Sequence, residues 1–187
     1  MSLARLIAVV AAILFALLPA TASSQAAPPE IARGLAWLQA RVQADGSLDD
    51  EAASLGSVLQ ARSETARTLR QLATAPPALV DAIGAFADDD TETLARRIDT
   101  LQAAGRDVSA LVADLASRQN ADGGFGPLPG YDSTAFDTAF ALEALASAAP
   151  TATGAAGGAL SFLIARQAAD GGLHFASDVS DHYATVL

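Results

Sequence analysis

The chain has 187 residues and no cysteine, and this absence excludes several kinds of chemistry. It has no disulfides, no thiolate nucleophile and no zinc site built on thiolates. Lysine is absent as well, because all eleven basic residues are arginine, so a lysine Schiff base is excluded. With no disulfides to contribute, stability must come from packing.

Positive charge is scarce throughout the chain. Eleven arginines stand against 21 acidic residues, which gives a formal net charge of −10. Binding to phosphate backbones requires clustered cations, so a nucleic-acid partner is not expected. Attraction to anionic lipid surfaces also needs a basic patch, and the sequence shows none.

The N-terminal segment has the features of a secretory signal peptide. Arg5 precedes an uncharged apolar run, Leu6 to Leu18, and small residues follow at Ala20-Thr21-Ala22. The run is 13 residues long, whereas a membrane-spanning helix needs about 20. We therefore expect residues 1–26 to be cleaved. The rest should be an exported domain without a transmembrane helix that is periplasmic, cell-surface or secreted.

Three segments of the remaining chain resemble one another. In each, an amphipathic stretch ends at an Asp-Gly turn and an apolar residue follows. The turns are Asp45-Gly46, Asp122-Gly123-Gly124 before Phe125, and Asp170-Gly171-Gly172. Glycine suits a left-handed turn after a helix. The second and third turns lie 48 residues apart, but the first and second lie 77 apart, so a degenerate repeat is expected between them.

The periodicity predicts an all-α domain. Expected helices span about 29–43, 49–73, 77–87, 91–104, 107–119, 133–147 and 156–168, and another opens near 178. The acidic run 88–90 should supply helix N-terminal charges. The small residues of 151–158 are expected to form a loop. The last residues, 184–187, resemble the start of a helix and no capping repeat follows, so we expect a chain truncated at its C-terminus.

Phe162, Leu163 and Gln167, with the glycine turn after them, resemble the Gln-Trp type repeat of squalene cyclases. Gln119 occupies the matching position one repeat earlier. The segment 122–139 is similar to the Gly-Gly-Phe loop and following helix of protein prenyltransferase β-subunits. This resemblance implies an α/α toroid of helix-pair repeats over residues 27–187, incomplete at about half of a ring.

The same comparison argues against that superfamily's catalysis. Its acid motif, Asp-x-Asp-Asp-Thr-Ala, corresponds here to residues 134–139, and Phe136 stands at the proton donor's position. Phenylalanine cannot donate a proton. The zinc site of the transferases requires a cysteine that this chain lacks. No cofactor and no metal are expected.

Candidate binding residues remain at the predicted helix ends and in the last loop. They are Tyr131, Asp132, Phe136, Asp137, His174, Asp181 and His182. Phe136 and Phe140 have the spacing of one helix face, which favours core packing over ligand contact. A site at the two histidines would need a third group such as Asp181 to converge on them.

Two functions are compatible with these features. The favoured one is a non-catalytic binding or scaffolding module of an exported protein, with a protein, a glycan or a hydrophobic small molecule as partner. The alternative is a cyclase-like or prenyltransferase-like enzyme whose catalytic residues lie beyond Leu187. The sequence favours the first function and leaves open whether the protein is an enzyme.

Overall fold

The computed structural model describes residues 28–53, 56–87, 89–148, 153–174 and 180–181. By its contacts the chain divides into two units, residues 1–32 and 33–187. Within the first unit, the described residues 28–32 form a helical turn in which the Ala32 amide donates to the Pro28 carbonyl at 3.0 Å. The predicted signal peptide, 1–26, lies outside the described residues. The described part of the chain contains no helix long and apolar enough to span a bilayer.

The described residues confirm the all-α prediction. Their helices are α2 (Pro29–Arg41), the short 3-10 helix η1 (Glu51–Ala53), α3 (Val58–Leu72), α4 (Pro77–Gly84), α5 (Thr91–Ala103), α6 (Ser109–Ser117), α7 (Ala135–Ala148) and α8 (Thr153–Arg166). A pair of two-residue strands, β1 (Leu173–His174) and β2 (Ser180–Asp181), is antiparallel.

Three expectations about these elements were wrong. The single helix over 49–73 is divided, because Ser57 caps a new helix by accepting a hydrogen bond from the Gln60 amide at 3.1 Å. The helix expected over 156–168 begins earlier, at Thr153, so residues 153–155 are helical and not part of a loop. The helix expected near 178 is contradicted at residues 180–181, which pair as a strand with 173–174.

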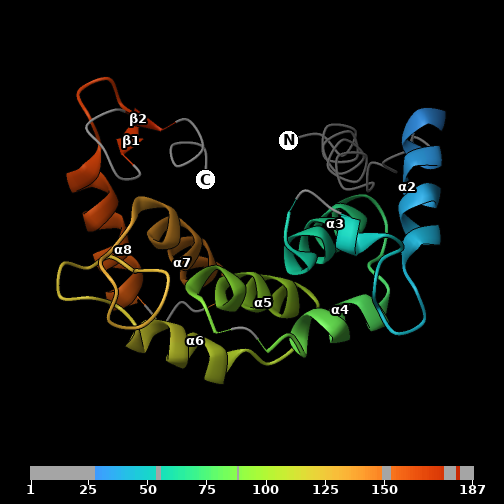
Figure 1. The fold of residues 1–187 in the computed structure, drawn as a ribbon, viewed down its shortest axis with the longest axis horizontal. Helices are drawn as coiled ribbons and strands as arrows, with labels where there is room; N and C mark the ends of the chain where they lie inside the picture. Colours follow the sequence, from blue (N-terminus) through green and yellow to red (C-terminus); the bar gives the residue numbers. More distant parts are fainter. Residues whose placement is uncertain (1–27, 54–55, 88, 149–152, 175–179, 182–187) are drawn as a thin grey trace, which may run out of the picture. The chain divides into compact units, whose positions relative to one another are not determined.

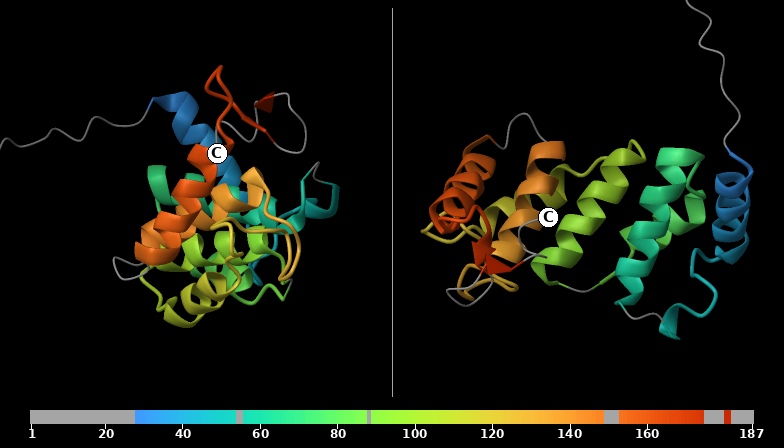
Figure 2. Two further views of the ribbon diagram at one scale, coloured as in Figure 1. Left: turned by 90° about the vertical axis from the view of Figure 1, so that its left-hand side faces the viewer. Right: turned by 90° about the horizontal axis from the view of Figure 1, so that it is seen from above.

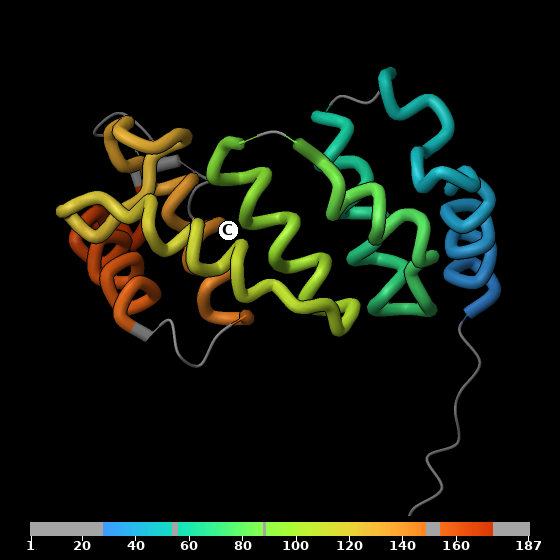
Figure 3. The backbone as a smooth tube through the Cα atoms, turned by 90° about the horizontal axis from the view of Figure 1, so that it is seen from below, coloured from blue at the N-terminus to red at the C-terminus, as the bar shows by residue number. Residues whose placement is uncertain are grey.

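Helix α5 lies between α3 and α7 and packs against both (Figure 1). The view from above in Figure 2 shows these three helices side by side. Helices α4 and α6 also pack against α5. They lie below it in the orientation of Figure 1 and face the viewer in Figure 3. One apolar cluster joins α5, α6, α7 and α8 around Phe125, and a second joins α3 and α4 around Leu69 and Leu79.

The three Asp-Gly turns adopt the same conformation. Gly46, Gly123 and Gly171 have φ angles of +82°, +85° and +90°. Before each of these glycines, the aspartate Oδ1 accepts a backbone N–H two residues further on, at 2.9–3.0 Å. Helices α7 and α8 lie between the second and third turns, and α3 to α6 lie between the first and second. The degenerate repeat predicted from the spacing is therefore the pair α4 and α5.

Gln119 and Gln167 stabilise two of these turns through their side-chain amides. Each Nε2 donates to the carbonyl of the turn glycine four residues later, at 2.8 Å in both repeats. Gln119 also donates to the Ala155 carbonyl of α8 at 2.8 Å. Gly158 allows this approach, since a Cβ there would lie 2.7 Å from the Gln119 Nε2. The first repeat has Val42 in the matching position, and the valine side chain has no amide group to donate.

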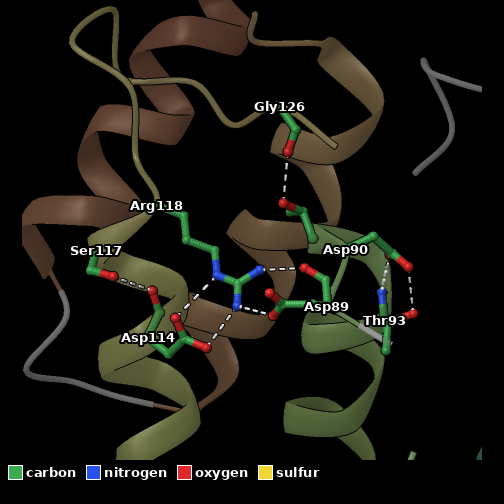
Figure 4. A network of polar contacts seen from close by, with 8 residues as sticks. Asp89, Asp90, Thr93, Asp114, Ser117, Arg118 and Gly126 are labelled. Atoms are coloured by element: carbon green, nitrogen blue, oxygen red, sulfur yellow. Dashed lines mark hydrogen bonds and ion pairs between the residues drawn. The ribbon is translucent and has the colours of Figure 1, made fainter. Parts of the chain in front are cut away.

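The degenerate repeat replaces its Asp-Gly turn with an ion-pair network before α5 (Figure 4). Arg118, whose side chain is 7% exposed, binds Asp89 Oδ1 at 2.6 Å and Asp114 Oδ2 at 2.8 Å. Hydrogen bonding to Asp114 raises the pKa of Arg118. Asp90 caps α5 by accepting from the Thr93 amide at 2.7 Å, which confirms for this residue of the acidic run the predicted role at the helix N-terminus.

Candidate functional site: a charged pocket between helices

A pocket of about 540 Å³ opens between α3, α4, α5 and α7 within the second unit. That volume lies in the range of small-molecule sites, about 300–1,000 Å³. Its lining combines apolar and charged side chains. The buried apolar part consists of Ala66, Val80, Ala95, Phe140 and Ala144. Alanine at these helix positions keeps the backbones close and still leaves space for a ligand.

Arg96 is fixed at the edge of the pocket. Its side chain is 8% exposed, and its Nη1 donates to Ser63 Oγ at 3.2 Å and to Glu64 Oε1 at 2.8 Å. Its Nε donates to Glu92 Oε1 at 2.8 Å. Its guanidinium also lies over the Phe140 ring, 4.8 Å from the centroid. Arg96 therefore links α3, α5 and α7.

The hydrogen bonds of Arg96 also stabilise its positive charge. Burial lowers the pKa of this guanidinium, but the hydrogen bonds to Glu64 and Glu92 outweigh burial, so the pKa lies above its usual value. Arg96 is therefore a permanent cation with its carboxylate partners already in place. A second pocket arginine, Arg106, is paired as well, because its Nη2 lies 2.8 Å from Asp81 Oδ1.

Four other charged residues line the pocket with weaker partners or none. Arg67 and Arg70 lie three residues apart on α3, Asp99 is on α5, and Glu143 is on α7. Arg67 Nη2 lies 3.8 Å from Glu143 Oε1, which is too long for a direct hydrogen bond. Asp99 Oδ1 lies 3.5 Å from Ser147 Oγ. Arg70 has no ion pair or side-chain hydrogen bond among the described residues.

Four of the residues proposed from the sequence, Tyr131, Asp132, Phe136 and Asp137, do not line this pocket. Tyr131 and Asp132 are exposed in the loop before α7, and Tyr131 is 59% exposed. Phe136 packs edge-on against Phe140 at 4.8 Å between ring centroids, as its core spacing predicts. Asp137 is 7% exposed and also lies apart from the pocket lining.

The predicted histidine site falls at the end of the described chain. The backbones of His174 and Asp181 belong to the paired strands β1 and β2. His182 lies outside the described residues. Among the residues that the structure describes, no group of three histidine, aspartate or glutamate side chains is placed to hold a metal ion.

Asp137 and its neighbours form a structural junction in the segment whose sequence resembles the cyclase acid motif. The Thr134 hydroxyl accepts from the Asp137 amide at 3.0 Å and donates to Asp137 Oδ2 at 2.6 Å. The Thr138 hydroxyl accepts from the Phe125 amide at 2.9 Å. Burial, with a contribution from Glu92, raises the pKa of Asp137. This motif anchors the Gly-Gly-Phe loop to α7.

The pocket was missed because its residues come from separate helices. A partial signal exists in the sequence, since Arg67 and Arg70 share a helix face with Ser63 and Ala66 in an otherwise acidic chain. Four of the eleven arginines line this pocket. Helical spacing alone does not show which helices converge.

The likeness to the cyclase and prenyltransferase repeats rests on the sequence motifs at the turns and at residues 134–139. The structure supplies the physical role of each of them in turn formation, capping or packing. No protein-family model matches the chain, and no curated protein matches it in sequence.

Proposed function

We propose that this protein is a non-catalytic binding module of an exported protein, and that its ligand occupies the pocket between α3, α4, α5 and α7. The observation that supports this most directly is the pocket itself. Its volume is about 540 Å³, and its buried apolar floor is bordered by charged side chains. A concave site with an apolar body and a few polar groups is typical of small-ligand recognition.

The pocket is built more like a binding site than a reaction centre. Its buried cation, Arg96, is held by three hydrogen bonds to side chains and is not aimed at an open position. Asp137, the carboxyl group with a raised pKa, serves in capping and lies apart from the lining. No observation favours the cyclase-like alternative over binding. The α/α toroid, the signal peptide and the export of the chain belong to the same proposal, and they rest on the sequence patterns.

A neutral apolar fluorophore, N-phenyl-1-naphthylamine, tests the site without involving charge. We expect its fluorescence to rise on binding to the wild-type chain lacking residues 1–26. Ala103→Trp places a large ring in the pocket lining at the end of α5 and should abolish the rise. Ala113→Trp is the matched control, because this exposed α6 residue lies outside the lining.

Both variants should keep the wild-type helical circular dichroism. If Ala103→Trp left binding unchanged, the pocket would not be the binding site. Formation of a cyclised terpene from squalene by the purified chain would overturn the non-catalytic proposal.

A further inference from the structure

The charges around the pocket fall into two classes. Arg96 is matched by Glu64 and Glu92, and Arg106 is matched by Asp81. The charges of these residues are balanced by ion pairs within the fold. Four charged residues of the pocket lining have no close ion pair among the described residues. Two are cations, Arg67 and Arg70, and two are carboxylates, Asp99 and Glu143.

We call Arg67 and Arg70 the cationic wall of the pocket, and Asp99 and Glu143 its acidic wall. The two cations come from α3, and the two carboxylates come from α5 and α7. The walls approach each other at Arg67 and Glu143, whose charged atoms are 3.8 Å apart and whose side chains are 49% and 44% exposed. A half-exposed pair of this kind contributes little to stability, so a ligand can replace it at small cost.

The floor between these walls is apolar. Ala66, Ala95, Phe140 and Ala144 are all buried, and they also line the pocket. A ligand lying on this floor must bury an apolar body to gain free energy from it. Two cations against two carboxylates give no net charge, so an anionic or cationic ligand would gain from one wall and be repelled by the other.

We propose that the pocket binds a zwitterionic ligand with an apolar body, its carboxylate held by Arg67 and Arg70 and its ammonium group held by Asp99 and Glu143. Arginine suits the carboxylate, since its guanidinium presents paired donors. On binding, the Arg67–Glu143 pair opens and each partner turns to a ligand charge. This inference rests on the proposed function, because it assigns the ligand class of the same pocket.

Two probes have an apolar body with a free amine and a free carboxylate, and they belong to different classes of compound. One is the tripeptide Leu-Leu-Leu with free termini, and the other is 12-aminododecanoic acid, which has no peptide groups. Isothermal titration should detect at least one of them, and the probe that binds identifies a peptide or a non-peptide ligand. Blocking the amine by acetylation, or the carboxylate by amidation, should each weaken binding about tenfold.

Charge variants then separate the two walls. Arg70→Gln should weaken the free and acetylated probes about tenfold and leave the amidated probe unchanged. Asp99→Asn should weaken the free and amidated probes and leave the acetylated probe unchanged. Asp50→Asn, at an exposed acid outside the pocket, is the control and should change none of them. General damage to the fold would weaken all forms equally and could not produce this crossed pattern.

The outcomes separate this inference from the proposed function. If Ala103→Trp abolishes binding of N-phenyl-1-naphthylamine but the zwitterionic probes do not bind, or bind regardless of their charged ends, the zwitterion inference is wrong and the pocket remains a binding site. If Ala103→Trp has no effect on the neutral fluorophore, both proposals fall together.

Discussion

Replacing Gly123 by alanine tests how the repeat turn is joined to the next helix. Gly123 has a φ of +85°, in the left-handed region that other residues adopt only at a cost. It also lies against α8, because a Cβ at this position would be 2.8 Å from the Gly158 carbonyl oxygen and 3.1 Å from its carbon. Both contacts are with backbone, so no side-chain rotation relieves them.

The expected cost has two parts. The left-handed conformation costs an alanine about 1–2 kcal/mol. The backbone contact adds to this by pushing α8 away from the turn and weakening the hydrogen bond from Gln119 to Ala155, which is worth about 1 kcal/mol. We therefore expect Gly123→Ala to lower the free energy of unfolding by about 2–3 kcal/mol. Such a loss is a large fraction of the stability of a typical domain, about 5–15 kcal/mol.

Urea unfolding followed by circular dichroism at 222 nm measures this loss, with Gly105→Ala as the matched control. Gly105 has a φ of +73°, but a Cβ at this position would meet no atom within 4 Å, so its alanine variant should show the conformational cost alone. Equal losses in the two variants would show that the contact with α8 contributes nothing. An unchanged midpoint in Gly123→Ala would refute the turn assignment itself.

Three further predictions address other parts of the fold. Arg118→Gln should lower the free energy of unfolding by about 1–3 kcal/mol in urea titrations, because two carboxylates lose their shared partner. Burial raises the pKa of Asp137, so the folded protein keeps this proton to higher pH than the unfolded chain does. Stability should therefore fall as pH rises from about 4 through the folded-state pKa, and Asp137→Asn should remove this component of the melting-temperature profile. In α8, Gly157→Ala should stabilise by up to about 1 kcal/mol, whereas Gly158→Ala should raise stability less or lower it, because its methyl group would contact Gln119; thermal melts of the two variants compare them directly.

Local features of the fold were predictable because each depends on neighbouring residues. Glycine after an aspartate permits a left-handed turn, and the aspartate accepts an amide two residues later, as in all three repeats. The 77-residue interval implied an extra helix pair, which is α4 and α5. The errors arose where distant contacts override local composition. Ala155, in the stretch expected to be a loop, is helical, and its carbonyl accepts a hydrogen bond from Gln119 of the preceding turn.

By itself, the sequence determined the helical class, the positions of the repeat turns and the absence of thiolate and lysine chemistry. It also indicated that Phe136 belongs to the core, since a four-residue spacing is a property of one helix. Only the tertiary structure decided where a ligand can bind. The pocket combines Arg67 and Arg70 from α3, Asp99 from α5 and Glu143 from α7, far apart along the chain. Which charges remain without close partners is decided by packing between helices, and helical periodicity does not encode that packing.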